Sequence, residues 1–253
     1  MKRLLGLVTK FKGHPASWHA FNHILLSRLP KFLYFDEYYQ MTGHENVPAL
    51  IKRQTDNKLE KSDYPMLGLV NLARLKLDDL LNVNRTLELT NTLEGAGNHL
   101  SRQILKYWSQ NKHLQMKFDV REAKPEDPEH MRAGVNIWAK VYDSVHWATT
   151  ELGSRSRGFV WFFSFLAWYE DVKRKCENII LLLDEPGLSL HGKAQADLLR
   201  YFEQELKPHH QVIYTTHSPF MVDPDHFERV RIVQDKSIDA QEPLPKDEEA
   251  RRF

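Results

Sequence analysis

The chain has 253 residues, of which 42% are hydrophobic and 27% charged, and its formal net charge is +1. This length can bury a substantial core and predicts one or two domains. The balanced charge gives no overall basic excess for nucleic acid, so any DNA contact would be a local patch. A single cysteine, Cys176, excludes an internal disulfide framework and suits a reducing cytoplasm.

Membrane insertion and export are not predicted. The longest strongly apolar run, residues 158–169, is shorter than the roughly 20 residues that a membrane-spanning helix needs. The apolar stretch after Lys2 and Arg3 is shorter than the roughly 7 to 15 residues of a signal-peptide core. We therefore expect a cytoplasmic protein that has no contact with a membrane.

The first half of the chain predicts helices around one early strand. Residues 1–30 are predicted to be helical, and an apolar strand follows at 32–36. Residues 45–112 read as mostly helical and polar, which is typical of a helical insertion in an α/β domain formed by residues 1–44 and 113–236. An ordinary helical layer packed on the sheet fits equally well. Five apolar residues in this segment recur at spacings of three and four: Leu93, Ala96, Leu100, Ile104 and Trp108.

The next segment predicts antiparallel strands and then a buried helix. Apolar and polar residues alternate over 113–120 and again over 135–141, and a turn at Asp143 and Ser144 leads into 145–149. Residues 158–169 are apolar on all sides, which favours a core helix over a platform for base stacking. The charged tail at 237–253 is predicted to be disordered.

Residues 179–191, IILLLDEPGLSLH, carry the clearest functional signal. An apolar run that ends in Asp-Glu predicts a parallel strand whose carboxyl end delivers two acidic side chains into a crevice. This is the layout of a Walker B element. Asp184 would help to hold Mg²⁺, which prefers oxygen ligands, and Glu185 would polarise the water that attacks a γ-phosphate.

A second strand is predicted in residues 211–222, QVIYTTHSPFMV, which contain His217. Ser218 and Pro219 suit the N-cap and first position of a following helix. Residues 193–206 between the two strands are predicted to be helical, with an apolar face formed by Leu198, Leu199, Phe202 and Leu206. A right-handed crossover would bring both strand ends to one sheet edge, so that His217 can approach Glu185 and a bound phosphate.

These segments resemble a known family. LLLDEPGLSLH followed by TTHSP is similar to the Walker B, D-loop and switch-histidine segments of ABC-type ATPases, in the branch that contains the OLD-family and RecF-like AAA ATPases. Upstream, ELGSRSRGFVWFF resembles the signature motif of this branch. The resemblance implies an incomplete ABC-type P-loop NTPase head, with a parallel-rich sheet flanked by helices, a helical insertion and a short antiparallel segment.

The resemblance also implies site residues and ligands. ATP and Mg²⁺ would bind between two heads, with Glu185 and His217 as catalytic residues and Asp184 at the metal. Nucleotide binding in trans would use the signature residues Ser154, Ser156, Arg157 and Gly158. The D-loop would comprise Gly187, Leu188, Ser189, Leu190 and His191, although ordinary ABC proteins have Asp at the last of these positions. Arg155 and Arg157 could reach a phosphate or simply be solvated.

Two further patterns are set aside. Asp36 and Glu37 also follow an apolar strand, but neither a D-loop nor a switch histidine comes after them, so we expect them to mark a core strand end without a catalytic role. Residues 187–194 are a formal near-match to the phosphate loop GxxxxGK[ST], but they end in Ala194 and overlap the D-loop. No Walker A loop is therefore predicted, and the chain looks like one that begins after it.

Three functions follow from this pattern. The first is an ATP-hydrolysing head that works as a homodimer or with a Walker A-bearing partner head. The second is a truncated or trans-acting module that does not hydrolyse ATP. The third is the ATPase part of an OLD-like nucleolytic defence or repair system, with DNA or a separate nuclease subunit as a partner. We expect weak or absent nucleotide binding by this chain alone.

Overall fold

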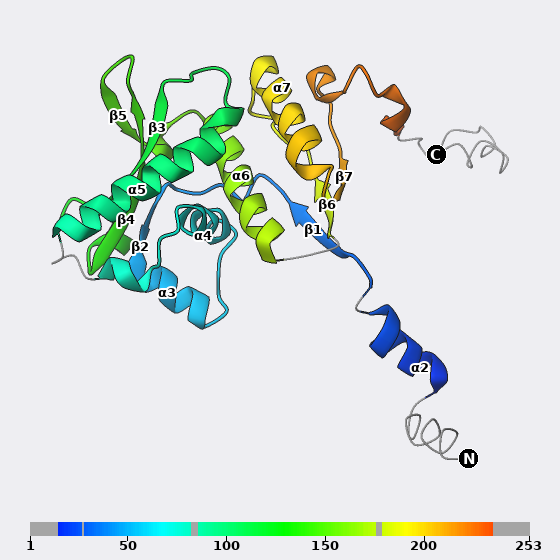
Figure 1. Cartoon of the computed structure of the whole chain (residues 1–253), viewed down its shortest axis with the longest axis horizontal. Coiled ribbons are helices and arrows are strands. Elements are labelled where there is room, and N and C mark those ends of the chain that lie inside the picture. The colour runs from blue at the N-terminus through cyan, green and yellow to red at the C-terminus, as the bar shows by residue number, and fades with distance from the viewer. Residues whose placement is uncertain (1–14, 27, 82–85, 176–178, 235–253) are drawn as a thin grey trace, which may run out of the picture.

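The computed structural model describes residues 15–26, 28–81, 86–175 and 179–234. They form an α/β fold with one parallel and one antiparallel sheet, and helix α6 runs between the two (Figure 1). The predicted fold class, α/β with a parallel sheet flanked by helices and an antiparallel segment, is confirmed. The predictions for Cys176 and for the tail at 237–253 lie outside the described residues.

The parallel sheet has the strand order β1-β6-β7. Strand β1 is Lys31–Phe35, β6 is Ile179–Leu183 and β7 is Gln211–Tyr214. Phe35 lies opposite Leu183, and Leu183 lies opposite Tyr214. All three strands therefore end at one edge of the sheet, as the crossover argument predicts.

The two faces of this sheet differ in burial. Leu181, Leu183 and Phe35 are buried on the inner face, whereas Phe32 is 64% and Ile213 50% exposed on the opposite face. The prediction of a core strand at 32–36 therefore holds for one face of β1 only. In the described sheet β1 is an edge strand, and its other face is open. Parallel sheets are normally covered on both faces, so this open face, formed by Phe32, Tyr34, Ile180, Leu182 and Ile213, is unusual.

The antiparallel sheet is built around β4, Val135–Asp143. It pairs along its whole length with β3, Leu114–Glu122, and its other edge is shared by β2, His44–Asn46, and β5, Ala148–Glu151. Strand β5 begins three residues later than the pattern at 145–149 predicts. Asp143 Oδ1 accepts the Val145 N–H at 2.9 Å, so the chain is still turning there.

Three longer helices follow β2, as predicted for the segment 45–112. They are α3 (Val47–Thr55), α4 (Asp63–Leu72) and α5 (Thr86–Ile104), with short turns η2 (Asp78–Leu81) and η3 (Leu105–Tyr107). Helix α4 packs on α6 and α5 packs on β3. The five periodic apolar residues are all buried in the shared core: Leu93, Ala96, Leu100, Ile104 and Trp108.

Helix α6, Arg157–Lys175, is the centre of the hydrophobic core. Every residue from Gly158 to Tyr169 is buried. Phe165 contacts the ring of Phe35 on β1 with a centroid distance of 5.1 Å, and Phe162 contacts Trp108 at 5.2 Å. Its aromatic residues therefore join the parallel sheet to the helical segment, and the prediction of a core helix is confirmed.

Helix α7, Gly192–Tyr201, and a π-helical turn η6, Phe202–Leu206, connect β6 to β7. Leu198, Phe202 and Leu206 are buried, and Phe202 contacts the Tyr214 ring on β7. The remaining turns are η4 (Glu129–Met131), η5 (Leu152–Ser154), η7 (Pro219–Met221) and η8 (Phe227–Arg229).

The helical structure predicted for residues 1–30 can be compared only from residue 15 onward, where residues 16–25 are helical. Helix α2 (Ala16–Ala20) and the π-turn η1 (Phe21–Leu25) are described there, while residues 1–14 lie outside the described part. Figure 1 shows α2 beyond the amino end of β1, away from both sheets.

Candidate functional site

The candidate site lies where β6 and β7 end side by side. The Thr215 N–H donates to the Leu183 carbonyl at 3.1 Å, so the pairing of the two strands continues one step beyond their ends. Asp184 and Glu185 follow directly on β6, and His217 follows on β7. Carboxyl ends of parallel strands are the usual ligand-binding edge of an α/β sheet.

Two hydroxyl groups contact the Asp184 carboxylate. Thr215 Oγ1 donates to Oδ1 at 2.6 Å, and Tyr34 Oη donates to Oδ2 at 3.2 Å. Desolvation of the Tyr34 hydroxyl and the negative charge of Asp184 raise the pKa of Tyr34, which keeps the hydroxyl protonated as a donor. Neither Tyr34 nor Thr215 stands out in the sequence as a site residue.

Glu185 and His217 form a close pair. His217 Nε2 lies 3.2 Å from Glu185 Oε1, and the His217 backbone N–H donates to Oε2 at 3.3 Å. The Glu185 side chain is 25% exposed and that of His217 is 93% exposed. The imidazole can therefore rotate toward solvent, while the carboxylate is held at the strand end.

Glu185 has a strained backbone. Its φ is +45°, in the left-handed region that residues other than Gly, Asn and Asp rarely adopt. Such a residue costs about 1–3 kcal/mol, and it persists only where the surrounding structure fixes it. The Glu185 N–H donates to Thr215 Oγ1 at 3.1 Å, so a side chain of the neighbouring segment holds this conformation.

The predicted D-loop forms a compact turn between β6 and α7. Gly187 has φ +72°, and its carbonyl accepts the N–H of Leu190 at 2.9 Å. Leu188 and Ser189 are exposed. His191 is the N-cap residue of α7, but its side chain makes no capping hydrogen bond.

Gln195 is a buried polar residue that the sequence analysis missed. Its Nε2 donates to the Gly187 carbonyl at 3.1 Å, and its Oε1 accepts from Ser218 Oγ at 2.7 Å. Ser218 in turn caps η7, with Pro219 at the first position as predicted. One amide thus ties the D-loop to the segment that carries His217.

The predicted signature residues surround the start of α6. Ser154 ends η5, and Ser156 Oγ accepts the Phe159 N–H at 3.4 Å just ahead of the helix. A Cβ on Gly158 would lie 2.6 Å from the Ser189 carbonyl oxygen, so only glycine permits this approach of α6 to the D-loop. Ser154, Ser156 and Arg157 are exposed, as an interaction in trans requires.

Arg155 is partly engaged within the domain. Its guanidinium lies 5.0 Å from the centre of the Phe159 ring, a cation–π contact. Arg157 is the more exposed of the two arginines.

The acidic pair after β1 has a different environment. Asp36 Oδ2 lies 2.6 Å from Lys61 Nζ, and Oδ1 accepts the Tyr38 N–H at 3.0 Å. Glu37 is exposed. Asp36 thus caps a turn and pairs with a lysine, whereas the side-chain donors to Asp184 among the described residues are two hydroxyl groups.

The Asp184 environment fits Mg²⁺. The ion prefers carboxylate oxygens, and it usually needs one or two of them together with phosphate oxygens and water. An ionised carboxylate has about four lone-pair sites. Thr215 and Tyr34 each take one, so each oxygen keeps one site, and no cationic side chain of the described residues is bonded to the group.

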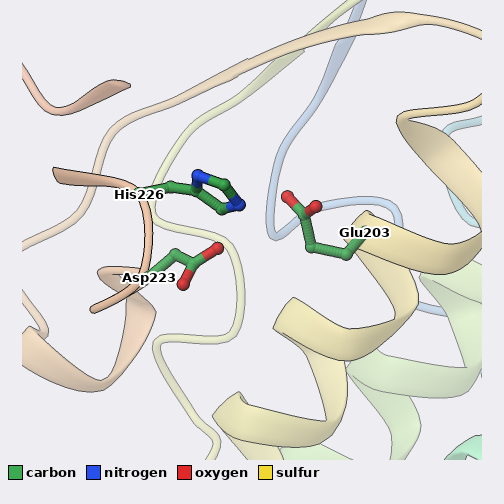
Figure 2. A group of neighbouring side chains, drawn as sticks. All are labelled: Glu203, Asp223 and His226. Carbon is green, nitrogen blue, oxygen red and sulfur yellow. The ribbon is translucent and has the colours of Figure 1, made fainter. Parts of the chain in front are cut away.

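Within the described part of the chain, Glu203, Asp223 and His226 form a second group of potential ligands (Figure 2). Both Glu203 oxygens are already engaged, because Lys207 Nζ lies 2.6 Å from Oε2 and Arg229 Nη1 lies 2.7 Å from Oε1. These contacts make Glu203 an ion-pair tether between η6 and the segment that follows β7. We therefore assign no metal to this group.

A hollow of about 700 Å³ lies at the amino ends of β6 and β7, lined by Arg28, Ile179 and residues 207–211 among others. It is at the opposite end of the strands from Asp184. The chemistry-bearing side chains of the two strands therefore do not face it.

The architecture defines an α/β domain with acidic residues at the carboxyl edge of a parallel sheet. A family model described as the AAA ATPase domain matches residues 45–222, more than half of the chain. The chain therefore belongs to this family and is an ATPase-type domain, which implies use of a nucleotide. Its finer placement in the OLD-family and RecF-like branch stays a prediction.

One protein is similar to this chain in sequence over part of its length. An uncharacterized protein of Methanocaldococcus jannaschii is 27% identical over 139 residues, which cover 53% of this chain and 33% of the relative. The chain thus spans about a third of that protein. None of the described helices is long and apolar enough to cross a membrane.

Two solved structures are similar over part of the chain. An Smc head bound to the C-winged helix domain of ScpA has a TM-score of 0.34 and 17% identity, covering 57% of this chain and 41% of that one. An Smc head with an extended coiled coil, bound to the C-terminal domain of ScpA derived from Pyrococcus furiosus, has a TM-score of 0.32 and 13% identity, covering 69% and 49%.

Proposed function

We propose that this domain supplies one half of an ABC-type ATP-hydrolysing site. Two heads would enclose ATP between a phosphate-binding loop on one head and the signature segment at the start of α6 on the other. The observation that best supports this is the meeting of Asp184, Glu185 and His217 at one edge of the parallel sheet. Carboxylates and an imidazole at such an edge are the groups that phosphoryl transfer to water requires.

Each residue would have a separate task. Asp184 would bind Mg²⁺, which when bound offsets the negative charge of the phosphates. Glu185 would accept a proton from the attacking water. His217, whose side chain is 93% exposed, would turn from Glu185 and donate a hydrogen bond to the γ-phosphate. Most of the rate gain would come from positioning and charge stabilisation.

The signature face would bind the phosphate held by the opposing head. Backbone N–H groups at a helix N-terminus favour anions, and α6 presents such an end beside the exposed Ser156 and Arg157. Gly158 keeps this end against the D-loop backbone, so movement of the D-loop and of the signature would be coupled.

The phosphate loop would lie outside these 253 residues, either on the same polypeptide or on a partner head. No GxxxxGK[ST] sequence precedes the signature in this chain. Among the described residues, one apolar face of the parallel sheet is open, and a sheet of this type is stable when a further layer covers it. The exposed Ser154, Ser156 and Arg157 favour a second candidate function, a module that offers its signature face in trans and does not hydrolyse ATP itself.

The ATP sandwich can be tested on the complexes that co-purify with an affinity-tagged version of this chain. Light scattering measures the mass of these complexes. In the presence of ATP and Mg²⁺, Glu185→Gln should hold two heads together for longer than the wild type, because ATP binds but is not turned over. If ATP changes the measured mass of neither the wild type nor Glu185→Gln, the ATP sandwich is contradicted. Equally long-lived ATP-bound dimers in both proteins would favour the non-hydrolysing module.

A further inference from the structure

We infer that Thr215 and Tyr34 are positioning residues that hold the Asp184 carboxylate in the orientation in which it accepts a divalent cation. This inference rests on the proposed function of Asp184 as the Mg²⁺ ligand. It assigns a role to Tyr34 on β1 and to Thr215, the residue that follows β7, neither of which was predicted from the sequence to act at the site.

The strand register explains why these two residues reach Asp184. Leu183 pairs with Tyr214, so the next residue on each strand brings Thr215 beside Asp184. Tyr34 pairs with Leu182, two residues before Asp184 and on the same face because side chains alternate along a strand. The longer tyrosine side chain spans this diagonal offset and ends 3.2 Å from Oδ2.

The hydrogen-bond inventory fixes the direction of each contact. A threonine hydroxyl has one proton, and Oγ1 of Thr215 accepts the Glu185 N–H at 3.1 Å. Its proton is therefore free to point at Asp184 Oδ1, 2.6 Å away. One hydroxyl thus fixes the carboxylate of Asp184 and the strained backbone of Glu185 together.

Positioning of this kind has a measurable effect on metal binding. Outer partners of a metal ligand restrict its orientation, and their removal typically lowers metal affinity about 10–100-fold. Without the two hydroxyls, the Asp184 side chain would rotate freely at the exposed strand end. Metal binding would then have to restrict this rotation, and the lost entropy would lower the affinity for the metal. The effect should be larger for Thr215, which makes the shorter bond and also holds Glu185.

Mn²⁺ titration followed by electron paramagnetic resonance tests the inference on the complex isolated with the tagged chain, in the presence of ATP. Thr215→Val keeps the branched shape and should weaken Mn²⁺ binding about 10–100-fold, whereas Thr215→Ser should stay close to wild type. Tyr34→Phe should weaken Mn²⁺ binding about 3- to 10-fold. ATP binding measured in EDTA should be unchanged in both variants. A general structural defect would instead weaken ATP binding as well.

Matched controls separate the possible failures. Thr149→Val on the exposed strand β5 and Tyr38→Phe at an exposed position just after β1 should both keep wild-type Mn²⁺ affinity. If Asp184→Asn abolishes Mn²⁺ binding while Thr215→Val and Tyr34→Phe bind like wild type, the positioning role is wrong and the metal site stands. If Asp184→Asn itself binds Mn²⁺ like wild type, the proposed metal site is wrong and this inference falls with it.

Discussion

Glu185 combines three unusual features in one residue. It has a left-handed backbone, it follows directly on the aspartate at the strand end, and both of its carboxylate oxygens contact His217. Backbone strain at a residue that can take part in chemistry indicates that the placement of its side chain matters more than the stability that the strain costs. The strain should therefore be detectable by substitution.

Replacing Glu185 by glycine and by alanine should separate strain from side-chain loss. Both variants lose the contacts with His217, but only glycine adopts φ +45° at no steric cost. Glu185→Gly should therefore unfold with a free energy about 1 kcal/mol higher than that of Glu185→Ala. Urea unfolding of the two variants measures this difference.

Glu37 provides the matched control, since it is exposed and its φ is not in the positive range. There the order should reverse, with Glu37→Ala the more stable by about 0.4–1 kcal/mol, because glycine loses more freedom on folding. The same order at both positions would show that Glu185 stores no strain.

Asp143 predicts a pH dependence of stability at the end of β4. The hydrogen bond to the His146 ring, together with those from the backbone N–H groups of Val145 and His146, lowers the pKa of Asp143 from 3.8 to about 2. A carboxyl with a lowered pKa stabilises the fold fully above its ordinary value, and this contribution is lost as pH falls toward 2. Stability should therefore fall between about pH 4 and pH 2.

Urea unfolding at pH 5 and at pH 2.5 would test this for wild type and Asp143→Asn. The variant should be less stable than wild type at pH 5 and should lose less stability on acidification, because its amide does not titrate. An equal loss in both proteins would assign the acid sensitivity to other groups.

At the scale of elements, sequence patterns predicted the regular pieces well. The 3.6-residue spacing of Leu93 to Trp108 gave α5, and the alternation over 113–120 and 135–141 gave β3 and β4. Strand β2 was missed because three residues, His44–Asn46, are too short to show a period. The open face of β1 could not be predicted either, because Phe32 and Phe35 look alike in sequence and differ only in what packs on them.

Within the candidate site, the acidic pair and His217 were accessible from sequence because they follow apolar strands. Tyr34 and Thr215 were not, since their contacts with Asp184 join positions 150 and 31 residues apart and depend on strand register. Gln195 was hidden for a similar reason, because a buried amide that links two loops has no local pattern.

Two glycines in α5 test how closely this helix is fitted to the antiparallel sheet. A Cβ on Gly97 would lie 2.4 Å from the Met116 carbonyl oxygen on β3, whereas one on Gly95 meets no atom within 4 Å. Gly97→Ala should destabilise the fold by about 1–3 kcal/mol through overpacking. Gly95→Ala should stabilise it by about 0.5–1 kcal/mol, because alanine favours helix.

Chemical unfolding of both variants gives the comparison directly, since they differ by two positions on one helix. Equal stabilisation by both substitutions would mean that α5 and β3 are not in close contact at Met116.

At the scale of the whole molecule, α6 connects the two sheets of the domain. Its aromatic core joins the parallel sheet, which carries Asp184 and Glu185, to the antiparallel sheet and the helical segment. Its N-terminus lies against the D-loop through Gly158. If the start of α6 binds a second head, as we propose, this close contact would connect that binding directly to the segment that follows Asp184 and Glu185.

The most direct test of the account is the rate of phosphate release from ATP by the complex isolated with the tagged chain. Glu185→Gln should lower this rate about 100-fold or more, the usual contribution of a general base. Glu37→Gln, the same substitution after the other acidic strand, should leave it unchanged. Equal rates for wild type and Glu185→Gln would contradict the assignment of Glu185 and of the site built around it.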